Sequence, residues 1–212
     1  MKNNLEPQLS GNTIILFGSS TNFAKEVIDT CKRLELAYIP YENMESPRVI
    51  SDAVTRDLLD LNPNNKYKKI TSLGYPWTKQ TAVELADKEF EFSWTSLVDP
   101  TTILGSDVEI GEGSYINAGC VIGSGSKIGK HVTINRAVNI GHDVSIDDFT
   151  FIGPGVTICG KVSIGAAVFI GAGSIVIDKV EIGSKVNVGA GTLVTKNFKG
   201  PVSIRGVPAK LF

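Results

Sequence analysis

Hydrophobic residues in the second half of the chain recur at every sixth position. The position four residues further on is small or β-branched almost throughout and is never charged. Ten of the seventeen aliphatic positions are followed directly by glycine, where we expect a turn with positive φ. The period runs without insertion through Val98, Leu104, Ile110, Ile116, Ile122, Ile128, Ile134, Ile140, Ile146, Ile152, Ile158, Ile164, Ile170, Val176, Ile182, Val188 and Val194.

A unit with one buried aliphatic, one small inward residue and one turn predicts a strand that cannot bury its apolar face alone. Stacked units bury a continuous hydrophobic column, so the period predicts an all-β parallel β-helix. The pattern resembles the hexapeptide-repeat family, which implies a left-handed helix of triangular section with three units in each coil. We expect this fold over residues 93–212, including a C-terminal tail that covers the last coil.

Residues 1–92 follow different periods. They predict strands at 13–18, 36–42 and 66–74, and helices at 23–34, 47–61 and 77–89. Alternating strands and helices are typical of a parallel sheet with short crossovers. We therefore expect a small N-terminal α/β domain, Rossmann-like, that covers the first end of the β-helix.

Composition and charge narrow the function classes. The 21 Lys and Arg residues against 22 Asp and Glu leave a net charge of −1, which argues against nucleic acid or an anionic membrane as a partner. The N-terminal residues lack the apolar core of a signal peptide, and no apolar run reaches the length of a membrane span. Three separated cysteines favour a reducing compartment, so a cytoplasmic protein is expected.

The first candidate site is the turn after the first predicted strand, with Gly18, Ser19, Ser20 and Asn22. Ligands of open α/β sheets bind at the carboxyl ends of the strands, and a helix N-terminus attracts phosphate. Since the full G-x-G-x-x-G motif is absent, these residues leave a phosphate site and a purely structural turn equally open. Gly74 follows the third predicted strand and is expected at the same sheet edge.

The second candidate site is His142 with Asp143, at a corner of the predicted β-helix. Gly160 follows His142 by 18 residues and should lie one coil further on, about 4.8 Å away. A histidine beside a free backbone N–H is the geometry of a general base facing an oxyanion donor. Asp143 would orient the imidazole, and Asn135 would offer its amide at the same edge.

Three segments together resemble the PglD/NeuD group of sugar acyltransferases: TINRAVNIGHDVSIDDFTFIGPGVTICGKVSIG, the N-terminal ILFGSSTNFAKEV and the C-terminal IRGVPAK. The resemblance implies homotrimers with active sites between subunits, acetyl-CoA as co-substrate, a nucleotide sugar as acceptor and no metal. It implies His142 as general base, Asp143 as its assistant, Asn135 at the start of the segment and the Gly160 amide facing the acetyl carbonyl. Implied cofactor contacts are Gly160, Phe151, Ala172, Ala190, Val207, Pro208 and Lys210.

The chain departs from the group's pattern mainly in the acceptor half of the site. Asn22 stands where the group has a histidine that reaches the sugar, and Phe23 replaces a glycine. Tyr41 and Glu42 occupy the place of an acidic pair that contacts the nucleotide base. Phe151 replaces a histidine that touches the cofactor, and Asp143 stands for the usual Glu.

Several alternatives remain from the sequence. The same base would serve O-acetylation of a sugar hydroxyl, of the sialic-acid type, and a non-catalytic β-helix trimer is also open. A γ-type carbonic anhydrase needs three zinc histidines, but this chain has only two. Cys159 could form an acyl-enzyme, although a small residue that fills a tight turn is the simpler interpretation. The second histidine, His131, is expected at the surface.

Overall fold

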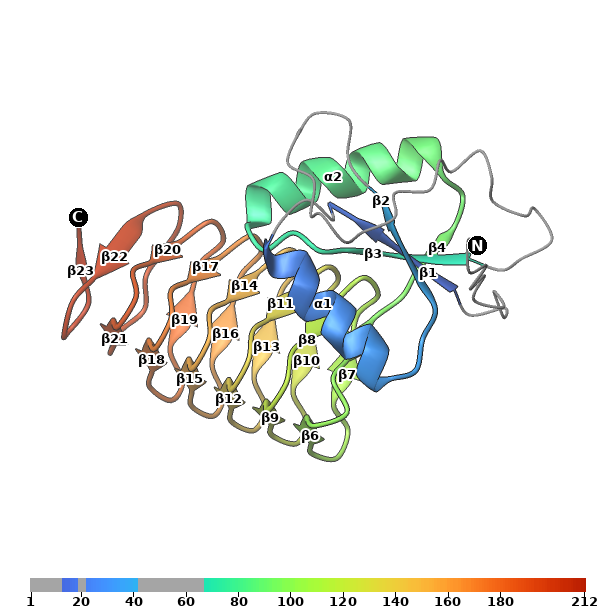
Figure 1. Cartoon of the computed structure of the whole chain (residues 1–212). Coiled ribbons are helices and arrows are strands. Elements are labelled where there is room, and N and C mark those ends of the chain that lie inside the picture. The colour runs from blue at the N-terminus through green and yellow to red at the C-terminus, as the bar shows by residue number, and fades with distance from the viewer. Residues whose placement is uncertain (1–12, 19–21, 42–66) are drawn as a thin grey trace, which may run out of the picture.

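The computed structural model describes residues 13–18, 22–41 and 67–212. Its N-terminal part is a parallel sheet of four strands in the order β2-β1-β3-β4, accompanied by two helices (Figure 1). The strands and helices predicted there are confirmed, except that the helix expected at 47–61 lies outside the described residues. The elements are β1 (Thr13–Phe17), α1 (Asn22–Arg33), β2 (Tyr38–Tyr41), β3 (Tyr67–Thr71), α2 (Pro76–Glu89) and β4 (Ser93–Trp94).

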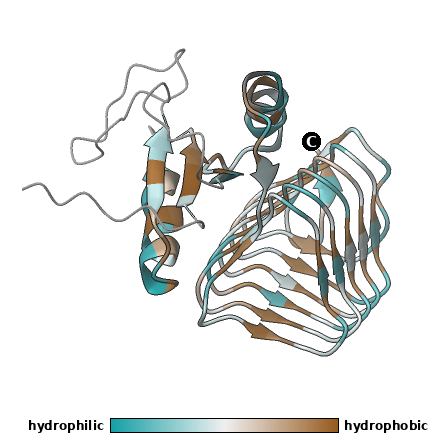
Figure 2. Cartoon of the chain, turned by 90° about the vertical axis from the view of Figure 1, so that its right-hand side faces the viewer, coloured by the Kyte–Doolittle hydropathy of each residue, from teal (hydrophilic) through white to brown (hydrophobic). Residues whose placement is uncertain are grey.

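The rest of the chain is a left-handed parallel β-solenoid, whose coils superpose in a triangular section when viewed along the axis (Figure 2). Each side of the triangle is one sheet. The eight-stranded sheet contains β5 (Leu97–Val98), β8 (Tyr115–Ile116), β11 (Thr133–Ile134), β14 (Phe151–Ile152), β17 (Phe169–Ile170), β20 (Asn187–Val188), β22 (Ser203–Arg205) and β23 (Lys210–Leu211). The six-stranded sheet contains β6 (Ile103–Leu104), β9 (Val121–Ile122), β12 (Asn139–Ile140), β15 (Thr157–Ile158), β18 (Ile175–Val176) and β21 (Leu193–Val194). The five-stranded sheet contains β7 (Glu109–Ile110), β10 (Lys127–Ile128), β13 (Ser145–Ile146), β16 (Ser163–Ile164) and β19 (Glu181–Ile182).

The coils stack with a constant offset of 18 residues. Thr133 pairs with Phe151, and Phe151 with Phe169, in parallel register. The predicted aliphatic column is confirmed, because nearly all its members are buried in one continuous core cluster. Most inward hydroxyls join that core without losing hydrogen bonds, as Ser114 Oγ donates to Gly129 O at 2.7 Å and accepts from Val132 N at 3.0 Å; the exception is Thr192 Oγ1.

The structure corrects the expected reason for the glycines that follow the aliphatic residues. Positive φ occurs two residues later, as at Gly113 and Gly125, and not at Gly111 or Gly141. A Cβ on Gly141 would lie 2.6 Å from Gly160 N, and one on Gly111 would lie 2.5 Å from Gly129 C. These glycines are therefore required by the close approach of successive coils rather than by a left-handed turn.

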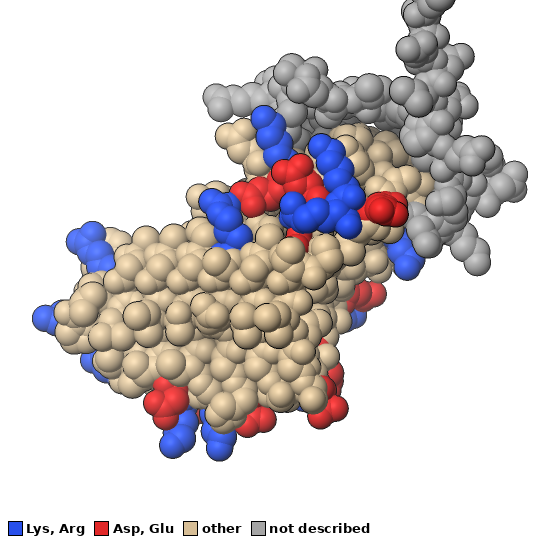
Figure 3. Space-filling model, turned by 60° about the horizontal axis from the view of Figure 1, so that its bottom comes forward, with Lys and Arg blue, Asp and Glu red and all other residues tan. Residues whose placement is uncertain are grey.

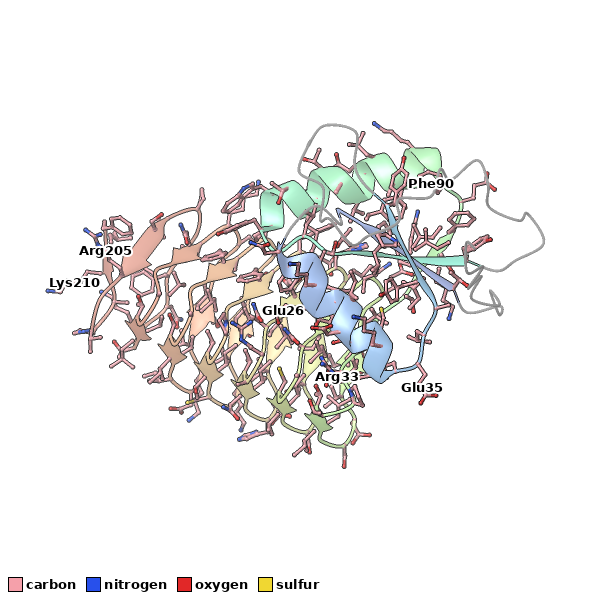
Figure 4. All side chains as sticks on the ribbon, viewed as in Figure 1. Glu26, Arg33, Glu35, Phe90, Arg205 and Lys210 are labelled. Atoms are coloured by element: carbon pink, nitrogen blue, oxygen red, sulfur yellow. The ribbon has the colours of Figure 1, made fainter. Side chains whose placement is uncertain are left out.

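The N-terminal sheet and helices lie against the eight-stranded side of the solenoid. Arg33 of α1 forms an ion pair with the buried carboxylate of Asp99 at 2.5 Å, and Thr30 Oγ1 donates to the same group at 2.9 Å. Glu26 of α1 accepts from Asn117 Nδ2 at 2.6 Å and pairs with Arg136; Figure 4 shows Glu26 and Arg33 on the helix beside the solenoid.

The expectation that the α/β part covers the first end of the solenoid is therefore wrong for the described residues. The core-column residue Leu104 in the first coil remains 43% exposed, since the helices pack on a side of the triangle instead. The other end is closed as expected, because Phe198, Ile204 and Ala209 of the tail join the solenoid core. No helix among the described residues is long and apolar enough to cross a membrane.

The burial of Lys79 and His131 was not foreseen from the sequence. Lys79 of α2 is buried against the solenoid, where its Nζ donates to His131 O at 3.1 Å and to Thr133 Oγ1. His131 is also buried rather than on the surface, because Trp94 packs edge-on against its ring and Phe149 stacks on it. Burial lowers the pKa of Lys79 to about 7, and burial together with the charge of Lys79 lowers the pKa of His131 to about 4.

We predict that the Lys79 site makes stability rise with pH between 7 and 8.5. The unfolded chain keeps this lysine protonated in that window, whereas the folded chain releases the proton as pH passes its lowered pKa. The free energy of unfolding should therefore increase by at most about 1.4 kcal/mol per pH unit. Lys79→Met should flatten this slope in denaturant titrations at fixed protein concentration. An equal slope in both proteins would contradict the assignment.

Candidate active site

His142 and Asp143 occupy the corner between the six-stranded and five-stranded sheets. His142 Nδ1 lies 2.9 Å from Asp143 Oδ2, and both side chains are more than half exposed. Asp143 adopts a φ of 54°, and its N–H donates to Ser124 O at 3.0 Å. The backbone of the corner thus holds the carboxylate against one ring nitrogen, which leaves Nε2 available to a substrate.

Glycines in the neighbouring coils make room for this pair. A Cβ on Gly125 would lie 2.8 Å from Asp143 Oδ1, and a Cβ on Gly160 would lie 2.7 Å from His142 Nε2. The structure therefore places Gly160 next to His142, one coil further on. Lys161 N donates to His142 O at 2.9 Å, whereas the Gly160 N–H donates to no group among the described residues. A free backbone donor lies beside the free imidazole nitrogen.

Asn135 does not share this corner. It follows β11 and lies between the eight-stranded and six-stranded sheets, where it is only 6% exposed. Its Oδ1 accepts from Asn117 Nδ2 at 3.1 Å and from Arg136 N at 2.7 Å. We expected Asn135 and His142 at the same edge of the solenoid. Within a single chain this expectation is wrong, because one side of the triangle separates the two residues.

The expected cofactor contacts Ala172 and Ala190 follow β17 and β20, at the same corner as Asn135. The candidate residues thus divide between the two edges of the six-stranded sheet. The outward residues of that sheet carry no charge, and Figure 3 shows a long uncharged surface with charged side chains at its margins. They are Ile103, Val121, Asn139, Thr157, Ile175 and Leu193.

The two turns expected to bind substrate meet at the carboxyl edge of the N-terminal sheet. A Cβ on Gly18 would lie 2.7 Å from Leu73, and one on Gly74 would lie 3.1 Å from the Phe151 ring. The structure therefore brings Gly74 against Phe151 of the solenoid. Asn22 is exposed at the start of α1, while Tyr41 packs edge-on against Phe17 at 5.2 Å. The candidates Ser19, Ser20 and Glu42 lie outside the described residues.

The C-terminal motif lies at the far end of the solenoid, where Figure 4 labels Arg205 and Lys210. Val207, Pro208 and Lys210 are exposed. Lys210 lines a hollow of about 400 Å³ together with Lys196, Asn197, Phe198, Lys199, Val202 and Leu211. Lys196 follows His142 by three coils at the same corner, so the hollow lies about 14 Å along the axis from the histidine.

The sequence interpretation missed an aromatic stack beside Gly74. Phe151 and Phe169 stack at 5.1 Å, Tyr75 stacks on Phe169 at 5.5 Å, and Trp77 stacks on Tyr75 at 5.4 Å. The separation of 18 residues between the two phenylalanines was a signal available in the sequence. Tyr75 and Trp77 could be placed only by the docking of α2.

We compared the chain with protein families, curated sequences and solved structures. Residues 161–196 match the family "Bacterial transferase hexapeptide (six repeats)". No curated protein sequence matches the chain.

Solved structures match nearly the whole chain. A histidine-to-asparagine mutant of perosamine N-acetyltransferase from Caulobacter crescentus, in complex with CoA and GDP-perosamine, is 26% identical with a TM-score of 0.84, covering 95% of this chain and 97% of that one. PerB from the same organism, with the same ligands, is 27% identical with a TM-score of 0.82 and the same coverage. The acetyltransferase domain of PglB from Neisseria gonorrhoeae is 25% identical with a TM-score of 0.84, covering 94% and 99%.

The fold, the repeat and these likenesses together define an acyltransferase with a left-handed β-solenoid, whose residues 161–196 are similar to the hexapeptide transferases. Of the solved structures that resemble this chain over both of its parts, the Caulobacter mutant is a perosamine N-acetyltransferase and the Neisseria structure is an acetyltransferase domain.

We predict that Gly160→Ala preserves the fold but lowers acyl-transfer turnover by at least about tenfold. The added methyl would displace the exposed imidazole of His142, which can rotate without disturbing the core. Thermal unfolding and steady-state kinetics check both parts. Cys159→Ser, one residue earlier, is the control and should keep wild-type turnover; an unchanged rate for Gly160→Ala would contradict the prediction.

Proposed function

We propose that this protein transfers the acetyl group of acetyl-CoA to an amino group on a nucleotide-activated sugar. In this proposal residues 1–92 form a Rossmann-like unit that binds the nucleotide sugar, and residues 93–212 form the acyltransferase unit. The observation that carries the proposal is the His142–Asp143 pair beside the free Gly160 N–H. The ligands of the similar Caulobacter enzyme, CoA and GDP-perosamine, support the two substrate classes.

The chemistry requires one base and one oxyanion donor. His142 Nε2 takes a proton from the sugar amine as its nitrogen attacks the acetyl carbonyl, and Asp143 stabilises the resulting imidazolium. The Gly160 N–H donates to the oxygen that becomes negative in the tetrahedral intermediate. When the carbon–sulfur bond breaks, the imidazolium returns the proton to the sulfur, so that an amide and free CoA are formed.

The lysine-lined hollow supports the placement of acetyl-CoA along the corner. Lys196, Lys199 and Lys210 supply three cations, and none of the lining residues is acidic. A thioester at His142 and phosphates at this hollow would span about 14 Å along the solenoid axis. Cations are the groups expected around phosphates, and lysine binds them as a point charge.

The division of candidate residues between two corners supports an active site shared by subunits of a homotrimer. Packing through the uncharged six-stranded sheet would bury Ile103, Val121 and Ile175, which are 64%, 39% and 44% exposed in the single chain. That packing would bring the His142 corner of one subunit opposite the Asn135–Ala172 corner of its neighbour.

We predict that His142→Ala lowers kcat by about 10²–10⁴-fold, since a positioned general base contributes that much. Affinity for acetyl-CoA and thermal stability should stay unchanged, because the side chain is 63% exposed and not part of the core. Release of free thiol from acetyl-CoA, measured with a panel of amino and hydroxyl nucleotide sugars, gives the rate and the acceptor class. Near-wild-type turnover would refute the mechanism, and trapping of acetylated Cys159 would favour an acyl-enzyme instead.

A complementation experiment tests the shared site. His142→Ala inactivates one edge, and Ala172→Arg should block the opposite edge, so each pure variant should be inactive. Mixed trimers of the two should recover about a quarter of wild-type activity, because one interface in four combines two intact edges. Light scattering should confirm that the mixture is trimeric. If these trimers recover no activity, the whole site lies within one subunit.

A further inference from the structure

A stack of four aromatic rings covers the point where α2 meets the solenoid, and the reaction steps above do not use it. The rings of Phe151, Phe169, Tyr75 and Trp77 follow one another with interplanar angles between 6° and 22° along the closest contacts. The two phenylalanines form the partly buried base on the eight-stranded sheet. Tyr75 and Trp77 form the outer part, which remains 55% and 58% exposed. We refer to these four residues as the aromatic stack.

The main chain that carries the outer rings is fixed by hydrogen bonds, although the rings are exposed. Tyr75 immediately precedes α2, Pro76 opens the helix, and Lys79 N donates to Tyr75 O at 3.0 Å. Thr78 Oγ1 donates to the same carbonyl at 3.0 Å. One turn further on, the buried Lys79 side chain fixes the helix to the solenoid. A rigid surface loses little conformational entropy when a ligand binds to it.

Packing alone does not account for Trp77. Tyr75 already covers the two phenylalanines, whereas Trp77 contacts the stack only through Tyr75 among the ring contacts. The indole N–H of Trp77 and the hydroxyl of Tyr75 have no hydrogen-bond partner in the part of the chain that the structure describes. A large exposed aromatic surface with open polar groups at its edge is typical of a binding site.

The position of the stack indicates what binds there. It adjoins Gly74, whose missing side chain allows contact with the Phe151 ring, at the edge where the N-terminal sheet ends. It also adjoins the corner of Ala172, three residues after Phe169 along the chain. In the proposed trimer this corner faces the His142 of the neighbouring subunit. A ligand ring that binds to the aromatic stack would therefore lie between the sheet proposed to bind the nucleotide and the reacting groups.

We propose that Tyr75 and Trp77 bind the sugar ring of the acceptor, with its apolar C–H face on the aromatic surface. This inference rests on the proposed function, because the amine on that ring must reach the neighbouring His142. The C–H groups of a sugar ring are weakly positive and complement the negative face of an aromatic ring. The open indole N–H and phenol hydroxyl then serve the hydroxyl groups at the ring edge. Tyr75 and Trp77 thus determine acceptor specificity.

Binding is tested with a probe that needs no turnover. A methyl glycoside of an amino-deoxyhexose should shift the indole N–H signal of Trp77 in NMR spectra of the full-length protein. The chain has only two tryptophans, so the signal of Trp94, whose indole N–H donates to Asp87 Oδ1 at 2.8 Å, serves as the internal reference. A free nucleoside diphosphate should leave Trp77 unshifted. The proposal is overturned if the glycoside causes no shift, or if the diphosphate alone shifts Trp77 equally.

Kinetics supply the second readout. Trp77→Ala should raise KM for the amino nucleotide sugar by about 3- to 10-fold, while kcat and KM for acetyl-CoA stay near wild type. Trp77→Phe, which keeps an aromatic face, should restore most of the affinity. If the trimer instead dissociates in Trp77→Ala, the residue is a subunit contact and the proposal fails. If wild-type protein acetylates no nucleotide sugar, the proposed function fails, whereas the glycoside experiment still decides the binding role.

Discussion

The parallel pairing of each strand with the strand 18 residues later is the constraint on which the rest of this structure depends. It places one aliphatic side chain of every unit above another and closes the core without any helix. It also aligns every corner residue in a column along the axis. Gly160 lies beside His142 for this reason, since a glycine has no side chain that could contact the imidazole. The candidate active site is thus a consequence of the coil length.

The same constraint explains why chemistry is confined to corners. Positions in the core column must be aliphatic, and nine of the ten glycines that follow them leave no room for a Cβ, because such an atom would lie 2.5–2.8 Å from the next coil. Packing does not restrict residues such as His142 and Asp143, since both side chains are mostly exposed. A corner can therefore change its chemistry at little cost in stability, whereas a change at Gly141 would force adjacent coils apart.

Contacts between the N-terminal part and the solenoid add a second level of organisation. The buried carboxylate of Asp99 with Arg33, and the buried Lys79 with His131, fix α1 and α2 to one side of the triangle. A buried charge is costly unless it keeps its hydrogen-bond partners. Only one docking geometry of α1 and α2 provides the partners at both positions. That geometry brings Gly74 and Tyr75 onto the phenylalanines of the solenoid, which joins the expected acceptor turn to the acyltransferase part.

The sequence by itself determined the solenoid, its register and the neighbourhood of His142, because a strict six-residue period converts spacing along the chain directly into distance along the axis. It also predicted β1, β2, β3, α1 and α2 of the N-terminal part, but not β4. Only the tertiary structure decided that His131 is buried beneath Trp94, and that Tyr75 and Trp77 extend the Phe151–Phe169 stack. These features depend on how α1 and α2 pack against one side of the triangle, and such docking follows from complementary shape and charge between distant segments, which no local period encodes.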